Sequence, residues 1–171
     1  MEGFRGRTTA KLYVFNDPDG SIAKILEKGA PVDIFKEFLI MEKTIRGNVF
    51  LIEGVNAIWK LATGIGGVDP FGPNACIGVG DGTTPESPIQ TGLLGTNKAY
   101  KKVDSGYPKI TDNKVEYRAT FGPDEAVFDW HEWTVANGCG DEYINLNRKV
   151  EDLGRKSANT TAVLHVIFEI V

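Results

Sequence analysis

The sequence has few of the residues from which metal and redox sites are built. It contains two cysteines and two histidines in 171 residues. Neither Cys76 nor Cys139 has a second cysteine or a histidine at the spacing of a zinc knuckle or a redox pair. We therefore expect two free thiols. The alternative is a single disulfide across a long stretch of chain, which a reducing cytosol disfavours.

Long apolar runs and an excess of positive charge are also missing. No stretch of about 18 apolar residues occurs, and the first residues, Met-Glu-Gly-Phe-Arg, lack the apolar segment of a secretory signal. We expect a soluble protein without a membrane partner. Nineteen Lys and Arg stand against 23 Asp and Glu, with no cluster of one sign. Because a nucleic-acid groove requires clustered positive charge, nucleic acid is not expected as a ligand.

The composition is that of a folded domain rich in strands. Apolar residues make up 42% and charged residues 25%, which is typical of a globular chain. The 20 glycines and 8 prolines lie mostly between short apolar runs, as in turns that join strands. We expect a mainly β protein of the α+β class, with one helix and an antiparallel β-sandwich or jelly-roll-like domain.

Apolar residues in alternation predict the strands. In residues 115–121, for example, Val115, Tyr117 and Phe121 alternate with polar residues. The expected strands are residues 75–80, 115–121, 127–135 and 161–171, and the expected long loops are residues 64–74 and 81–92. Loops of this length in a compact domain are usually functional or contact a partner.

One amphipathic helix is expected near residues 50–63. Apolar residues recur there at steps of three and four: Leu51, Val55, Ile58, Trp59 and Ala62. Gly64 follows, and glycine is suited to end a helix in the left-handed conformation.

Residues 1–47 are interpreted as an N-terminal arm or hairpin that precedes a β-rich domain of residues 48–171. The segment 16–20, Asn-Asp-Pro-Asp-Gly, is a turn signal, so residues 11–28 are expected to form a hairpin. An arm would reach a neighbouring subunit, whereas an extra hairpin would pack on the same domain. The partner-binding candidates in this segment are Arg5, Arg7, Lys11, Phe35, Phe38, Leu39 and Ile40.

Short motifs that suggest chemistry have plainer alternatives. Residues 78–82, Gly-Val-Gly-Asp-Gly, are compatible with a phosphate loop, but the Lys and Ser/Thr of a P-loop do not follow. We interpret these glycines as a strand end that another backbone approaches closely. Asp129 and His131 share one face of a strand and would form at most a weak metal site. The alternative is a set of polar residues that face solvent or a partner subunit.

No catalytic residue, cofactor or metal is expected from the sequence. A Gly-x-Ser-x-Gly elbow is missing, and neither cysteine has a recognisable local histidine setting. We therefore do not expect an enzyme. The alternative is a hydrolase whose two carboxylates meet only in space, and Asp129 and Glu132 are the residues that we would test for it.

The order of segments over residues 48–171 resembles a known family. The segments are residues 48–59, Gly-Asp-Gly-Thr-Thr at 80–84, Gln-Thr-Gly-Leu-Leu-Gly at 90–95, residues 115–121, Trp-His-Glu-Trp at 130–133, Asn-Arg-Lys at 147–149, and Lys156 with the final apolar run. This order resembles a family of small virion structural proteins encoded by tailed bacteriophages. The Gly-Asp-Gly-Thr-Thr stretch and the closing segment are its most specific parts.

The resemblance implies a component of the virion, with a capsid decoration (cement) protein as the first expectation. Its partners would be the major capsid protein or other virion proteins, and copies of itself, with a trimer as one form. The alternative is a tail or head-tail accessory protein that binds a host receptor. In that case Tyr107, Trp130 and Trp133 would form an aromatic platform for a host-surface sugar.

Overall fold

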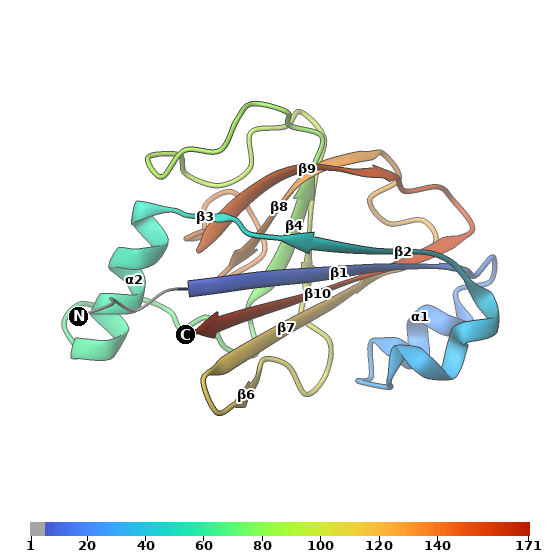
Figure 1. Cartoon of the computed structure of the whole chain (residues 1–171), viewed down its shortest axis with the longest axis horizontal. Helices are drawn as coiled ribbons and strands as arrows, with labels where there is room; N and C mark the ends of the chain where they lie inside the picture. The colour runs from blue at the N-terminus through green and yellow to red at the C-terminus, as the bar shows by residue number, and fades with distance from the viewer. Residues whose placement is uncertain (1–5) are drawn as a thin grey trace.

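The structure is a computed structural model that describes residues 6–171, and these residues form two antiparallel sheets of five strands each (Figure 1). The first sheet has the order β2 (Leu39–Arg46), β1 (Gly6–Asn16), β10 (Thr160–Ile170), β7 (Lys114–Phe121) and β6 (Lys109–Thr111). The second has the order β3 (Val49–Phe50), β9 (Asn147–Arg155), β8 (Asp129–Ala136), β4 (Cys76–Gly80) and β5 (Lys98–Lys102). The helices are α1 (Ser21–Leu26), the 3-10 helix η1 (Val32–Phe38) and α2 (Ile52–Thr63). The predicted mainly β, α+β sandwich is confirmed, and the jelly-roll topology stays a prediction.

The main core lies between the two sheets. It is built from alternate residues of β1, β7 and β10 in the first sheet and of β4 and β8 in the second. Trp130 of β8 is one of its largest side chains, with its ring 5.0 Å from the ring of Phe121. A smaller cluster on the outer face of the first sheet joins Phe15 and Val163 to Leu26 of α1. The sheet therefore carries an apolar layer on both faces.

Residues 6–46 belong to the first sheet. β1 pairs with β10 along its whole length and with β2 on its other side, so this part of the chain packs on the same domain. The expected hairpin is wrong in its second half, because residues 21–26 form α1. The carboxylate of Asp17 accepts hydrogen bonds from the N–H groups of Ile22 and Ala23, at 3.1 and 3.0 Å. These bonds satisfy donors that the first turn of a helix leaves unpaired.

Helix α2 confirms the expected helix, and Gly64 ends it with φ at 68°. Its packing is unusual for an amphipathic helix, because Gly54 and Ala57 are its only buried residues. A Cβ atom at Gly54 would lie 2.5 Å from the Cα of Leu146. Glycine at this position therefore allows the backbone of the helix to lie directly on the chain that enters β9. At 12 residues, α2 is the longest helix in the described chain, and no helix there is long and apolar enough to span a membrane.

The strands expected at residues 75–80, 115–121, 127–135 and 161–171 are present as β4, β7, β8 and β10. The sequence did not indicate β5, β6 or β9. β5 contains three lysines and β9 five charged residues. These charges hide the apolar alternation by which a strand is recognised.

The two cysteines form a disulfide, so the expectation of free thiols is wrong. Cys76 begins β4 and lies opposite Ala136, at the end of β8. Three residues further along, Cys139 lies with its Cα 5.3 Å from that of Cys76. The contact depends on the pairing of β4 with β8, and a separation of 63 residues gives no local signal of it.

Candidate interaction surfaces

Two of the three basic residues that the sequence suggested for partner binding lie in the described part of the chain, both on β1. Arg5 lies outside the described residues. Arg7, at the beginning of β1, is 3.5 Å from a carboxylate oxygen of Glu169 on the neighbouring strand β10. Lys11 lies further along β1 and faces the outer side of the first sheet. Arg7 and Lys11 are therefore part of the first sheet.

Two of the four apolar candidates pack on the domain, and the other two are exposed. Phe35 packs on the small outer cluster, with its ring 6.5 Å from that of Phe15, and Leu39 packs on the same cluster. Phe38 and Ile40 instead face solvent, and Ile40 exposes 61% of its surface. Two of the four apolar candidates are therefore available to a partner.

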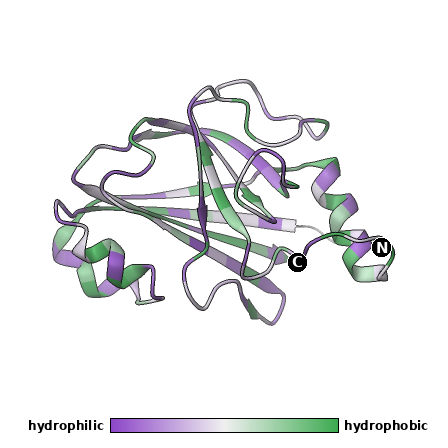
Figure 2. Cartoon of the chain, turned by 180° about the vertical axis from the view of Figure 1, so that it is seen from behind, coloured by the Kyte–Doolittle hydropathy of each residue, from purple (hydrophilic) through white to green (hydrophobic). Residues whose placement is uncertain are grey.

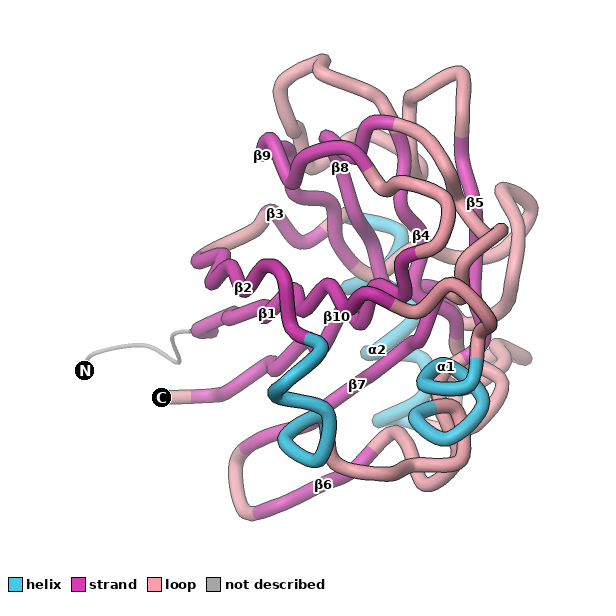
Figure 3. Tube along the Cα trace, turned by 90° about the vertical axis from the view of Figure 1, so that its right-hand side faces the viewer, coloured by secondary structure: helices cyan, strands magenta, loops and turns pink. Residues whose placement is uncertain are grey.

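Two further apolar residues close by in the chain are exposed as well. Ile34 of η1 and Met41 of β2 are also exposed. We call these four residues the η1–β2 patch: Ile34, Phe38, Ile40 and Met41. The patch lies at the end of the long axis that carries α1, and Figure 3 shows η1 and α1 on the side facing the viewer, with α2 behind the sheets.

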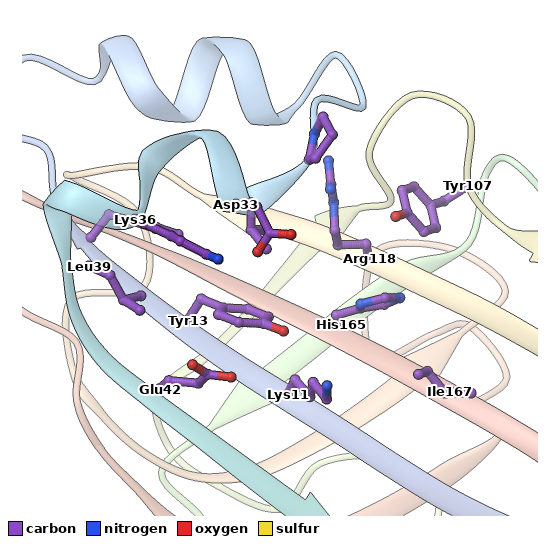
Figure 4. A pocket seen from close by; sticks show the side chains of 13 residues that line it. Lys11, Tyr13, Asp33, Lys36, Leu39, Glu42, Tyr107, Arg118, His165 and Ile167 are labelled. Carbon is purple, nitrogen blue, oxygen red and sulfur yellow. The ribbon is translucent and has the colours of Figure 1, made fainter.

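A polar pocket of about 530 Å³ lies on the outer face of the first sheet (Figure 4). Tyr13, Glu42 and Lys11 lie on its floor, and Asp33 and Lys36 project from η1 above them. Burial raises the pKa of Tyr13, and the nearby carboxylates of Glu42 and Asp33 raise it further. Acidic and basic side chains alternate around the pocket, as on a solvated sheet face.

Arg118, which lines this pocket, holds neighbouring segments of the chain together. The guanidinium of Arg118 is buried and donates to Asp104 Oδ2 at 2.7 Å, to the carbonyl of Leu26 at 2.6 Å and to the carbonyl of Ala30 at 2.8 Å. Arg118 therefore fastens α1 and the following loop to β7. No serine, threonine or cysteine lines the pocket, so the aliphatic hydroxyl or thiol of a Ser-His type of site is not found in this lining.

The second exposed apolar region is helix α2 itself. Figure 2 shows hydrophobic residues on this helix at the edge of the molecule as well as along the strands of the interior. Trp59 exposes 64% of its surface. We call the following exposed residues the α2 surface: Ile52, Val55, Ile58, Trp59, Leu61 and Ile65.

An apolar groove of about 690 Å³ adjoins the α2 surface. Ile58 and Leu61 line one side of it, and Phe50 and Phe168 line the part nearer the sheets. Ile110 of the edge strand β6 lies on the far side and exposes 79% of its surface. The pattern of residues 50–63 predicted the helix but not this groove, because the groove is formed by residues that are distant in the chain.

The glycine-rich motif at residues 78–82 packs against the side chain of Glu132. The carboxylate of Glu132 accepts hydrogen bonds from the N–H groups of Gly82, Leu94 and Gly95, at 2.6 to 3.2 Å. A Cβ atom at Gly80 would lie 2.5 Å from a carboxylate oxygen of Glu132. The close approach expected at these glycines is thus made by a side chain from β8. Within this motif, the N–H of Gly82 donates to Glu132 and the N–H of Asp81 donates to the carbonyl of Asn97.

The acidic-aromatic strand β8 supplies no sugar platform and no metal site of the kind considered. Trp130 and Trp133 are 1% and 0% exposed, and Tyr107 is also buried, so an exposed platform of these three residues is wrong. Asp129 lies 3.3 Å from Arg155, and His131 lies 3.6 Å from Asp152. Within residues 6–171, no three His, Cys, Asp or Glu side chains gather as metal ligands.

These features leave the η1–β2 patch and the α2 surface with its groove as the candidate interaction surfaces. Figure 1 places them at opposite ends of the longest axis. Comparisons of the chain with protein-family models, with curated proteins and with solved structures found no match.

Proposed function

We propose that this protein is a structural component of a tailed-bacteriophage virion, a capsid decoration protein that binds the assembled head and stabilises it. The proposal rests first on the order of sequence segments described above. The structural observation that carries it is the presence of exposed apolar residues at two ends of a small domain, since exposed apolar surface can mark a site of association. The protein would act by holding protein surfaces together.

We assign the η1–β2 patch to contact with the head shell. Its four apolar side chains lie on two consecutive elements, and Phe35 and Leu39 anchor these elements to the cluster around Phe15. A rigid base reduces the entropy that is lost on binding. Full burial of one such side chain contributes about 1.5 to 3 kcal/mol, so four of them support a modest contact.

Repetition would convert a modest contact into a stable coat. A head presents many equivalent copies of its major capsid protein, and linked copies of the decoration protein bind several of them at once. The second binding event is then intramolecular and its effective concentration is high. In this arrangement no single contact needs high affinity.

The test uses heads that lack the protein. Purified wild-type protein should cosediment with these heads, and the double variant Phe38→Ser, Ile40→Thr should bind at least about tenfold more weakly, as expected for the loss of an interface anchor. The matched control is Ile89→Thr, because Ile89 is 79% exposed and lies outside both surfaces. Circular dichroism should show the same fold for all three proteins.

Electron microscopy of the decorated particles distinguishes the rival roles. Regular density over the head supports the decoration role. Density confined to the tail or the neck contradicts it and favours the accessory protein. Unchanged binding of the double variant contradicts the assignment of the η1–β2 patch.

A further inference from the structure

Exposed apolar side chains gather at the end of the molecule that carries α2. Nine apolar side chains at this end of the molecule each expose at least 36% of their surface: the six of the α2 surface together with Ile110, Ile170 and Val171. Together they expose several hundred Å². This is the scale of the roughly 800 Å² that each partner contributes to a standard protein–protein interface.

The same surface combines a protrusion with a hollow. Trp59 exposes 64% of its surface and is adjacent in the helix to Ile58, which lines the 690 Å³ groove. A two-fold axis beside α2 would place Trp59 of each copy over the groove of the other. An interface of this kind is isologous and closes with two copies.

The charges around the groove favour a partner with the same balanced surface. Asp112 and Glu169 line it together with Lys114, and Lys60 lies on α2 beside Leu61. Lys114 and Glu169 form an ion pair of 3.6 Å within the chain, and Arg7 also pairs with Glu169. The charges beside the groove therefore largely neutralise one another, and a second copy with the same balanced rim meets no net charge that opposes it. A strongly acidic or basic partner would find no such match.

We infer that the α2 surface and its groove form the interface of a two-fold symmetric dimer of this chain. The inference does not depend on the virion role, because it concerns the free protein. It leaves the η1–β2 patch uncovered at the opposite end of each copy. A dimer would thus present two such patches.

Tryptophan fluorescence is the most direct probe. Trp59 is the only exposed tryptophan of three, since Trp130 and Trp133 are buried in the core. In a dimer all three tryptophans are shielded from water. At tens of micromolar protein the emission maximum should therefore lie at short wavelength, and acrylamide should quench the fluorescence only weakly. On dilution the emission should shift to the red as Trp59 becomes exposed. The variant Ile110→Glu keeps Trp59 and should show the red, quenchable emission at every concentration.

Sedimentation equilibrium gives the mass independently. The wild-type chain should sediment with twice its mass of 18.7 kDa, and Ile110→Glu and Trp59→Ser should each weaken association by about 30-fold or more. Both residues are exposed, so we expect both variants to fold, and unchanged thermal melting would confirm it. Ile40→Glu is the matched control, because it places a charge in the other apolar patch and should leave the mass unchanged.

Three outcomes would overturn the dimer. One is a wild-type monomer at tens of micromolar. Another is a trimer that Ile110→Glu does not affect. The third is a Trp59 emission that becomes shielded only when phage heads are added, which would assign this surface to the shell. Because head binding is measured with Phe38 and Ile40 variants, failure of the dimer and failure of the decoration role give different results.

Discussion

The side chains of Glu132 and Arg148 form an ion pair of 2.7 Å, and both are completely buried. The pair joins β8 to β9 beneath the glycine-rich loop. Arg148 also donates to the carbonyl of Thr84 at 2.8 Å and to the side-chain oxygen of Gln90 at 3.0 Å. The position of the loop is therefore set by two charges in the interior of the protein.

Glu132→Gln should lower the free energy of unfolding by about 3 to 5 kcal/mol, because it leaves the buried guanidinium of Arg148 without a counter-charge. Urea denaturation followed by circular dichroism measures this change. Asp129→Asn is the control on the same strand. Its partner Arg155 is exposed, so the loss there should stay below about 1 kcal/mol. Equal losses in the two variants would refute the anchor role of Glu132.

Gly54→Ala should destabilise the protein by about 1 to 3 kcal/mol, the usual cost of overpacking, although alanine is the better helix former. The reason is the 2.5 Å separation between the new Cβ and the Cα of Leu146. Gly67→Ala provides the comparison, since no atom lies within 4 Å of a Cβ placed there. A Gly54→Ala protein as stable as the wild type would show that α2 does not rest on the chain before β9.

Cys139→Ser should lower the free energy of unfolding by about 4 kcal/mol, because the disulfide closes a loop of 63 residues in the unfolded chain. Reduction of the wild-type protein with dithiothreitol should give a loss of similar size. The measurement is urea denaturation with and without reductant. If dithiothreitol also destabilised Cys139→Ser, the effect would not come from this disulfide.

The stability of the protein should fall as the pH drops below about 6.5, in part because of His165. Burial lowers the pKa of this imidazole below 6.5; the neighbouring Glu116 opposes that shift, while Arg118 and Lys11 add to it. The unfolded chain therefore takes up the proton first, and protonation favours unfolding. Urea denaturation at pH 7.5 and pH 5.5 should show a larger loss for the wild type than for His165→Gln. A smaller loss would mean that the ion pair with Glu116 outweighs burial.

Local patterns predicted the strands β4, β7, β8 and β10 and the long helix. The alternation in β7 and β10 depends on neighbours in sequence, so Tyr117, Ala119 and Leu164 could be assigned to the core correctly. The three- and four-residue spacing before Gly64 also depends only on neighbours. Such elements are visible without knowledge of the fold.

What the sequence could not predict depends on pairing between distant segments. The buried charges of Glu132 and Arg148 resemble ordinary surface charges until β8 and β9 are placed side by side. The disulfide becomes visible only when β4 is paired with β8. The groove beside α2 likewise needs Phe50, Ile110 and Phe168 to meet in space, and the exposure of its apolar helix reverses the usual assumption that such a face is covered by the same chain.

The pairing of β1 with β10 sets the order in which the molecule can form. Gly6 lies opposite Ile170 in the register, so the centre of the first sheet joins strands from distant parts of the chain. Until the ribosome has translated β10, β1 has only β2 as a partner, and their apolar faces stay open to the wrong contacts. Folding of this sheet therefore waits for β10 and should be slow, as expected for contacts of such long range.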